Sequence, residues 1–326
     1  MDAPEPHSLP DLHDIQAAAE RIRDLIHRTP TLSSRSLGEL HGGEVSLKAE
    51  NLQRAGAFKI RGALNALLVA RERAQLGPGG VLTYSSGNHG QAVALAARLL
   101  GFTATVVVPE DMARVKRAAV EAYGARIIVC GTTSEDRRLG AMRLARETGA
   151  HLIPPYDHPD VIAGQGTIAL EVLEDVPELE AVVVPIGGGG LIAGVSIAIK
   201  MLRPGVQVIG AEPSTSNDTA LSLARGKRVT IPPSKTIADG LRALTPGALT
   251  FEAIRRHVDQ VLCVDDNEIR QAQRLLLNRA KLLTEPSGAI SAAVYCRHGA
   301  ALAARKVALV LSGGNVDLPL FGETPS

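Results

Sequence analysis

The sequence has few aromatic residues and almost no net charge. Aromatic residues make up 2% of its 326 residues and tryptophan is absent. Proteins that bind nucleobases stack them on aromatic side chains, so this composition disfavours nucleic-acid binding. Lysine and arginine number 35 against 34 aspartate and glutamate, which favours neither nucleic acid nor an anionic membrane as a partner.

Cysteines and long apolar runs are also scarce. The three cysteines, Cys130, Cys263 and Cys296, lie far apart, which argues against a disulfide framework or structural zinc and fits a reducing compartment. No apolar run approaches the roughly 18 residues that a membrane span needs. The first residues, MDAPEPHSLPDLHD, contain no apolar signal-peptide core. We therefore expect a cytoplasmic protein that does not bind membranes.

Short apolar strands alternate with helical segments along most of the chain. The predicted strands are 45–49, 81–84, 104–108, 126–129, 151–153, 181–186, 206–211, 260–264 and 306–311. The predicted helices are 11–27, 56–73, 89–100, 113–123, 134–148, 164–173, 191–202, 266–281 and 286–297, and a further short element is expected at 221–224. This alternation predicts an α/β fold with two doubly wound domains and parallel sheets. Because glycine and proline interrupt the pattern at 77–80, we expect a small domain (77–156) between the parts of a large domain (1–76 and 157–326).

Lys59 lies in the segment GAFKIRG, where its neighbours are small or apolar. Its amine is therefore expected to lie against the protein, and desolvation makes an amine less basic and more nucleophilic. A carbonyl compound held there would form a Schiff base, and pyridoxal phosphate (PLP) is the usual biological carbonyl in that role. Most lysines are solvated surface residues, so this interpretation needs matching cofactor and substrate sites elsewhere in the chain.

Glycines follow the predicted strand 181–186 and begin a helix. Ligands of doubly wound sheets bind beyond the carboxyl ends of the strands. The run Gly187, Gly188, Gly189 and Gly190 would let backbone N–H groups converge on a phosphate at a helix N-terminus. A merely tight turn would need only one glycine.

Polar residues follow the predicted strand 81–84. Ser85, Ser86, Gly87, Asn88 and His89 offer hydroxyl, amide and backbone donors suited to a carboxylate, although an asparagine helix cap with flexible glycines explains them equally well.

Ser312, in the turn SGGN after the last strand, could hydrogen-bond a ring nitrogen, or it could belong to an ordinary polar turn.

Glu212 and Asp218 flank a short loop. With backbone carbonyl oxygens they could bind Mg²⁺ or Ca²⁺, or they could be solvated loop charges.

A dinucleotide site is a competing interpretation. Gly188, Gly190 and Ala193 match a G-x-G-x-x-A fingerprint, and Glu212 ends the next strand about 20 residues on. A nicotinamide oxidoreductase would leave Lys59 and the other two loops unexplained. A non-catalytic amino-acid sensor would need the same pocket but not Lys59.

Taken together, eight segments resemble fold-type II PLP enzymes of the threonine/serine dehydratase and serine racemase family. The resemblance extends over about residues 27–318, and its segments are GAFKIRGALNAL, SSGNHGQAVALAA, VIAGQGTIALE, VPIGGGGLIAG, AEPS, TIADGLR, TEPSGA and LSGGNVDL. It implies a PLP enzyme acting on a small amino acid and assembling as a homodimer or larger homo-oligomer.

The resemblance also implies a role for each candidate residue. Lys59 would bind PLP, with Phe58 beside the cofactor, the four glycines on its phosphate, Asn88 on its phenolic oxygen and Ser312 on its pyridine nitrogen. The loop from Ser85 to His89 would hold the substrate carboxylate, and Ser86 matches the racemase residue on the opposite face of Cα. Arg137 matches a position that approaches acidic ligands. Glu212, Asp218 and the carbonyl of Ser216 match a divalent-cation site.

The sequence departs from the family pattern at a few positions. Ala57 and Ala243 stand where relatives often have serine, and the segment PYDHPD is closer to the dehydratases than to the racemases. No counterpart of the C-terminal regulatory domain of biosynthetic threonine dehydratases follows the SGGN turn, so we do not expect feedback by isoleucine.

The expected reaction is β-elimination from threonine or serine, with or without some serine racemisation. A neutral serine at the pyridine nitrogen makes a weaker electron sink than a carboxylate would, which favours loss of the β-hydroxyl as the Cα proton leaves. Lys59 would take the proton, the phosphate would serve as acid for the departing water, and the products would be a 2-oxo acid and ammonia. Serine racemase and 3-hydroxyaspartate dehydratase activities are the alternatives.

Overall fold

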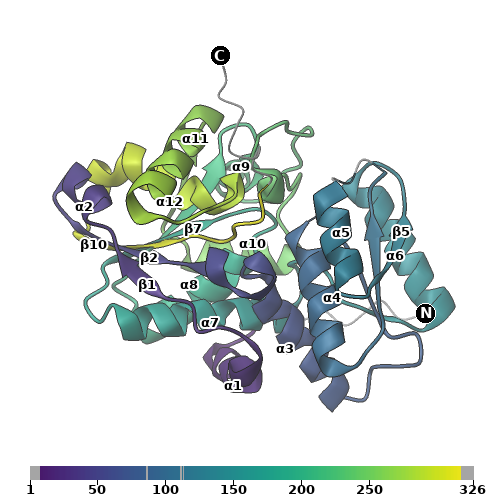
Figure 1. The fold of residues 1–326 in the computed structure, drawn as a ribbon. Helices are drawn as coiled ribbons and strands as arrows, with labels where there is room; N and C mark the ends of the chain where they lie inside the picture. Colours follow the sequence, from purple (N-terminus) through teal and green to yellow (C-terminus); the bar gives the residue numbers. More distant parts are fainter. Residues whose placement is uncertain (1–7, 86, 111, 113, 317–326) are drawn as a thin grey trace.

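The computed structural model describes residues 8–85, 87–110, 112 and 114–316. They form two β-sheets flanked by helices, which appear as two lobes in Figure 1. Within these ranges no helix combines the length and the apolar character that crossing a lipid bilayer requires.

The larger sheet has six strands in the order β1, β2, β10, β7, β8, β9. Their bounds are β1 Thr31–Ser33, β2 Glu44–Lys48, β7 Ala181–Pro185, β8 Gln207–Pro213, β9 Gln260–Val264 and β10 Lys306–Val310. Strand β1, which the sequence analysis does not predict, runs antiparallel to β2, whereas all other neighbours are parallel. The predicted parallel α/β sheet is therefore confirmed, with one antiparallel edge strand.

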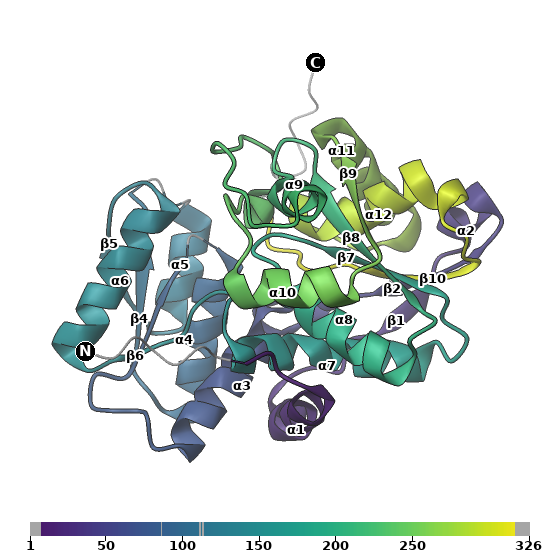
Figure 2. The same ribbon diagram turned by 180° about the vertical axis from the view of Figure 1, so that it is seen from behind.

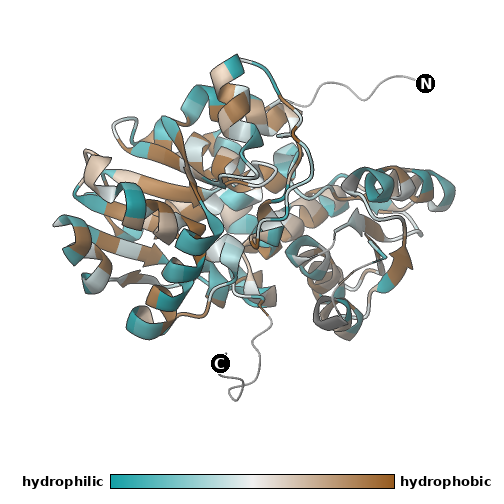
Figure 3. Ribbon diagram, turned by 90° about the horizontal axis from the view of Figure 1, so that it is seen from above, coloured by the Kyte–Doolittle hydropathy of each residue, from teal (hydrophilic) through white to brown (hydrophobic). Residues whose placement is uncertain are grey.

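Helices cover both faces of this sheet because successive side chains of each buried strand point to opposite faces. Val182 and Val184 pack in the core formed with α1, α7, α8 and α10, while Ala181 and Val183 pack in the core formed with α2, α11 and α12. The bounds are α1 Leu12–Ile22, α2 Arg35–His41, α7 Pro159–Asp175, α8 Gly190–Leu202, α10 Ala248–His257, α11 Asp266–Leu275 and α12 Pro286–His298. Figure 3 shows the apolar residues concentrated along these strands.

The smaller sheet has four parallel strands in the order β5, β4, β3, β6. Its strands are β3 Val81–Tyr84, β4 Ala104–Val108, β5 Arg126–Val129 and β6 His151–Leu152. Helices α3 Lys59–Glu72, α4 Asn88–Leu100 and α5 Arg114–Ala122 lie on one face and α6 Ser134–Thr148 on the other. All four strands fall inside the predicted range 77–156, although the exact domain boundaries stay a prediction.

Helix α3 lies between the two sheets, where it packs on both α4 and α7 (Figure 2). Several predicted helices have different bounds in the structure, and α7 and α11 are clear examples. Helix α7 begins at Pro159 rather than at 164, because His158 caps it and proline is favourable at the first helical position. Helix α11 ends at Leu275, and a π-helical turn leads to Lys281, which has a positive φ of 60°.

Candidate active site

A cavity of about 480 Å³ lies where the residues after β3, β7 and β10 meet. The carboxyl ends of parallel strands are the expected position for a ligand site. The predicted residues that line the cavity are Phe58, Lys59, Ser85, Gly87, Asn88, His89, Arg137, Gly187, Gly188, Gly189, Gly190 and Ser312. Ser86 lies outside the described residues, so its predicted role as a second acid/base group stays a prediction.

Lys59 is the first residue of α3, and its amine points into this cavity. The Nζ atom donates a hydrogen bond of 2.7 Å to the carbonyl of Pro155 and lies 5.1 Å from the ring centre of Phe58. Burial disfavours the ammonium form and lowers the pKa of Lys59 to about 8, although the negative charge of Glu285 partly opposes the shift. Near neutral pH a minor fraction of this amine is therefore neutral and nucleophilic, but a far larger one than in an ordinary lysine.

The turn after β10 pairs directly with the turn that precedes Lys59. The N–H of Phe58 donates to the carbonyl of Ser312 at 3.1 Å, and the N–H of Gly314 donates to the carbonyl of Gly56 at 2.8 Å. Gly56 has a positive φ of 69°, and a Cβ atom there would lie 2.2 Å from the side chain of Asn315. These contacts hold the Ser312 hydroxyl and the Lys59 amine on the wall of the same cavity.

The four glycines after β7 form a turn that leads into α8. Gly189 has a φ of +92°, a Cβ atom at Gly188 would lie 2.3 Å from the ring of Tyr156, and one at Gly187 would lie 2.8 Å from the carbonyl oxygen of Gly240. In the part of the chain that the structure describes, none of the four N–H groups donates a hydrogen bond to the backbone. They are therefore available to a phosphate at the N-terminus of α8.

Glu285 is a site residue that the sequence analysis does not assign. Its carboxylate is buried, lines the cavity and accepts a 2.6 Å hydrogen bond from the amide nitrogen of Asn88. The amide oxygen of Asn88 in turn accepts from Asn315 at 3.0 Å. The amide oxygen of Asn88 is thus bonded to Asn315, and one of its two amide N–H groups is bonded to Glu285. The second N–H can donate to a ligand in the cavity. That orientation suits the predicted contact with the phenolic oxygen of PLP.

His89 is buried beside Lys59. Its Nε2 lies 3.2 Å from the carbonyl oxygen of Ile153, which places the ring proton on Nε2. Burial, assisted by the positive charge of Lys59, lowers the pKa of His89 to about 3. The imidazole is therefore neutral at physiological pH, and the loop offers backbone donors rather than an imidazolium to a carboxylate.

The predicted metal ligands lie outside the cavity lining: Glu212 is near the end of β8, and Ser216 and Asp218 follow that strand. Glu212 is fully buried and accepts hydrogen bonds from the N–H groups of Thr219 and Ala220 at 3.0 and 2.9 Å. Asp218 is also buried, and its Oδ2 has no hydrogen-bond partner among the described residues. Burial raises the pKa of Glu212 to about 7, and burial with the nearby charge of Glu212 raises the pKa of Asp218 to about 8. Two carboxylates destabilised in this way fit a divalent cation.

This geometry fits a phosphate-bearing carbonyl compound. A phosphate would bind the free N–H groups of Gly187–Gly190, its aldehyde would meet Lys59 and a ring nitrogen would meet the Ser312 hydroxyl. A sequence profile of the family described as "Pyridoxal-phosphate dependent enzyme" matches residues 22–313. The chain belongs to this family of PLP-dependent enzymes.

Relatives within the family include both lyases and a racemase. L-threo-3-hydroxyaspartate ammonia-lyase of Saccharomyces cerevisiae is 45% identical over 315 residues, covering 96% of this chain and 95% of the relative. The structure of maize serine racemase superposes with a TM-score of 0.91 at 43% identity, covering 95% of this chain and 94% of that one. The structure of a threonine deaminase from T.th. gives a TM-score of 0.89 at 45% identity, covering 95% and 99% of the two chains.

Membership of this family confirms the predicted PLP-dependent, fold-type II architecture and makes the dinucleotide interpretation unnecessary. The structure also argues against Glu212 as the ribose ligand of a dinucleotide site. Both oxygens of Glu212 accept hydrogen bonds from the start of α9 (Asp218–Arg225), and Glu212 does not line the cavity as a ribose ligand would.

The lowered pKa of Lys59 gives a pH-dependent prediction. Attachment of PLP to cofactor-free protein should accelerate with rising pH to a midpoint near 8, because only the neutral amine attacks an aldehyde. Glu285→Gln should move this midpoint downward, because the carboxylate stabilises the ammonium form. The visible absorbance of bound PLP, followed after mixing at several pH values, measures the rate. A midpoint near the ordinary lysine value of about 10.4 would contradict the assignment.

Proposed function

We propose that this enzyme catalyses β-elimination from a small β-hydroxy amino acid, threonine or serine, and releases a 2-oxo acid and ammonia. The observation that carries the proposal is the neutral hydroxyl of Ser312 on the cavity wall, joined through its backbone to Phe58 beside Lys59. A hydroxyl does not keep a pyridine nitrogen protonated as a carboxylate would, which disfavours transamination and favours early loss of the β-substituent. The ammonia-lyase and deaminase named among the relatives support this choice.

Each residue group has a distinct task in this reaction. When bound, PLP supplies a sink for the electron pair released at Cα. The N–H groups of Gly187–Gly190 hold its phosphate, and the loop from Ser85 to His89 orients the substrate carboxylate. Lys59 takes the Cα proton as the Cα–H bond breaks. The departing hydroxyl also needs a proton, for which the cofactor phosphate would be the acid, and the Cβ–O bond then breaks with loss of water. Hydrolysis of the released enamine yields the 2-oxo acid and ammonia.

Elimination needs a proton acceptor on only one face of Cα, whereas racemisation also needs a donor on the other face. Lys59 supplies the first, and Ser86 is the proposed residue for the second. Ala243, which stands in place of a racemase serine, lines the cavity. We therefore propose that racemisation is the minor activity.

A substrate panel tests the proposal. L-Serine, L-threonine, L-threo-3-hydroxyaspartate and D-serine are incubated with the PLP-loaded enzyme, and both 2-oxo acid release and enantiomer composition are measured. Rapid 2-oxo acid formation from an L-substrate is expected. Inversion of serine without release of 2-oxo acid would overturn the assignment in favour of a racemase.

A second candidate substrate is 3-hydroxyaspartate, because arginines of α6 reach the cavity. Arg137 and Arg138 both line it, and Arg137 is largely buried with one N–H donated to the carbonyl of Thr132 at 3.2 Å. A buried guanidinium is well suited to a second substrate carboxylate. The yeast relative is named for this substrate.

Arg137→Met distinguishes the two substrates. It should lower kcat/KM for 3-hydroxyaspartate by about 10²-fold, since a hydrogen bond to a charged group contributes about 1.5–3 kcal/mol, and should change kcat/KM for L-serine far less. Arg143→Met, an exposed position on the same helix, is the matched control. Equal losses for both substrates would show that Arg137 does not recognise the second carboxylate.

We also propose that Glu212, Asp218 and the carbonyl of Ser216 bind Mg²⁺ or Ca²⁺. The two buried, mutually destabilising carboxylates and the unpartnered Oδ2 of Asp218 support this site. The cation would tie the end of β8 to the start of α9, close to Leu241 at the cavity wall, whose carbonyl accepts from the Ser216 hydroxyl at 2.9 Å.

Mg²⁺ should stabilise the parent protein but not Glu212→Gln. At a hundredfold excess over its Kd a ligand adds about 2.7 kcal/mol, which corresponds to a rise in Tm of roughly 5 °C. The rise should grow with pH across the values of about 7 and about 8 of the two carboxyl groups, because ionised ligands are needed. Glu178→Gln, at an exposed position, should respond like the parent. An unchanged response of Glu212→Gln in thermal unfolding would exclude this site.

We further propose that the protein assembles as a homodimer or a larger homo-oligomer, as its resemblance to the family suggests. Light scattering of the purified enzyme measures its mass directly, and a monomer would refute the proposal.

A further inference from the structure

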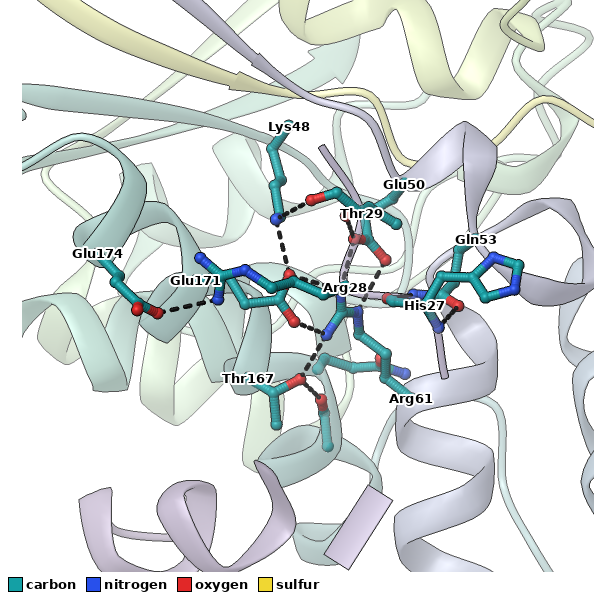
Figure 4. Close-up of polar contacts among 12 residues, drawn as sticks. His27, Arg28, Thr29, Lys48, Glu50, Gln53, Arg61, Thr167, Glu171 and Glu174 are labelled. Atoms are coloured by element: carbon teal, nitrogen blue, oxygen red, sulfur yellow. Dashed lines mark hydrogen bonds and ion pairs between the residues drawn. The ribbon is translucent and has the colours of Figure 1, made fainter. Parts of the chain in front are cut away.

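A cluster of four charged residues, three of them fully buried and the fourth partly buried, lies beside the helix that begins at Lys59. We refer to Lys48, Glu50, Arg61 and Glu171 as the Arg61 cluster, shown in Figure 4. Arg61 is fully buried and uses all five of its N–H donors. It donates to both oxygens of Glu50, each at 2.8 Å, to both oxygens of Glu171 at 2.6 and 3.0 Å, and to the Thr167 hydroxyl at 3.2 Å.

Lys48 balances the charge of the cluster. Its Nζ donates to the carbonyl of Thr29 and lies on an oxygen of Glu171, each at 2.7 Å. Two cations therefore meet two carboxylates in the interior. Burial alone would raise the pKa of Glu50, but the charge and hydrogen bonds of Arg61 lower it overall, so Glu50 is ionised. Lys48 also lies 3.7 Å from an oxygen of Asp175, which in turn pairs with the exposed Arg28, so the ion-pair network continues from the interior to the surface.

The cluster joins the segments that surround Lys59. Lys48 ends β2, Glu50 follows it, and Arg61 lies in the first turn of α3, two residues after Lys59. Thr167 and Glu171 lie on α7, which begins just after Pro155, the residue whose carbonyl accepts from Lys59. The Arg61 cluster thus ties the start of α3 both to the central sheet and to α7.

Helices α3 and α7 also touch through their backbones next to the cluster. A Cβ atom at Gly164 would lie 2.6 Å from the Cα of Gly62 and 2.7 Å from the carbonyl oxygen of Arg61. Such a close crossing permits little sliding, but glycines do not set the rotation of a helix about its own axis. The two forked contacts of Arg61 do set it, because each requires the guanidinium and a carboxylate to lie nearly in one plane.

Stability alone gives no reason for burying Lys48, Glu50 and Arg61, because apolar side chains of similar volume often stabilise a core as well or better. A bidentate ion pair instead fixes the orientation of the two side chains relative to each other. We infer that Arg61 is a positioning residue: its paired contacts with Glu50 and Glu171 orient the first turn of α3 so that the Lys59 amine faces the cofactor aldehyde and the substrate Cα. This inference rests on the proposed function for the role of Lys59 in turnover.

Arg61→Lys tests the inference, because lysine keeps the positive charge but cannot make the bidentate contacts of a guanidinium. Its kcat for elimination should fall by about 50-fold with KM changed less than about threefold, since misplacing a reacting group by 1 Å can cost 10²-fold. In cofactor-free protein, attachment of PLP to Lys59 should slow by about tenfold at fixed pH. Arg21→Lys is the matched control: Arg21 contacts Asn65 and Glu72 farther along the same helix and should leave both rates unchanged.

Thermal unfolding monitored by circular dichroism reports whether each variant is folded. If Arg61→Lys does not fold, Glu171→Asp decides, because it keeps the charge at a partly exposed position and withdraws the carboxylate from Arg61. It should lower both rates about tenfold while remaining folded. Folded variants that keep the parental kcat and the parental rate of PLP attachment would overturn the inference. The attachment rate remains informative even if the parent eliminates no substrate, so failure of the proposed function would be recognised separately.

Discussion

Replacing Lys59 by alanine is expected to reduce turnover by at least about 10⁴-fold, because in the proposed mechanism the residue both binds PLP covalently and moves the Cα proton. The protein should still fold and retain some PLP, since the N–H groups of Gly187–Gly190 do not depend on this side chain. Release of 2-oxo acid from the best substrate in the panel measures the loss.

Lys227→Ala, on an exposed segment, is the control for removal of a lysine and should retain parental turnover. An added primary amine of small size should restore part of the activity of Lys59→Ala, because it can enter the vacated space as a proton acceptor. Retention of a tenth or more of parental turnover by Lys59→Ala alone would remove Lys59 from the mechanism.

Gly188→Ala is expected to weaken PLP binding by about 10²-fold, equivalent to roughly 2.7 kcal/mol. The added Cβ would lie 2.3–2.4 Å from three ring carbons of Tyr156, so either the glycine turn or Tyr156 must move. Movement of the turn would disperse the N–H groups that are proposed to bind the phosphate. Movement of Tyr156 displaces the adjacent Pro155, whose carbonyl holds Lys59. Titration of cofactor-free protein with PLP measures the change in Kd.

Gly205→Ala is the matched control, because a Cβ atom there would have no neighbour within 4 Å. Its affinity for PLP should equal that of the parent. Parental affinity in Gly188→Ala would show that the turn after β7 does not hold the phosphate, and that the glycines serve packing against Tyr156 alone.

Local patterns were sufficient to predict most of the fold. Apolar strands with helices between them are repeated along the chain, and turn residues separate them, so the two parallel sheets could be predicted without tertiary information. Helix α10 was missed because its start depends on a distant residue. Asp157 accepts hydrogen bonds from the N–H groups of Ala248, Leu249 and Thr250, and a cap supplied from 91 residues away leaves no local signal.

The residues of the candidate site likewise include some that local sequence patterns predict and some that they do not. Residues that follow strands, such as Gly187 and Ser312, could be placed near Lys59 because parallel strands bring their carboxyl ends together. Glu285 was missed because an acidic residue before Pro286 is typical of a helix start. Each charge of the Arg61 cluster looks like an ordinary surface residue in the sequence, and only the packing of α3 against α7 shows that Arg61 is buried.

Chemical mapping of the cofactor attachment tests the central claim most directly. The PLP-loaded enzyme is reduced with borohydride, digested and analysed by mass spectrometry of its peptides. The account predicts that the visible band of the bound cofactor disappears on reduction and that a single pyridoxyl group is found on Lys59. A pyridoxyl group on another lysine, or the absence of any such modification in an enzyme that still releases 2-oxo acid, would contradict it.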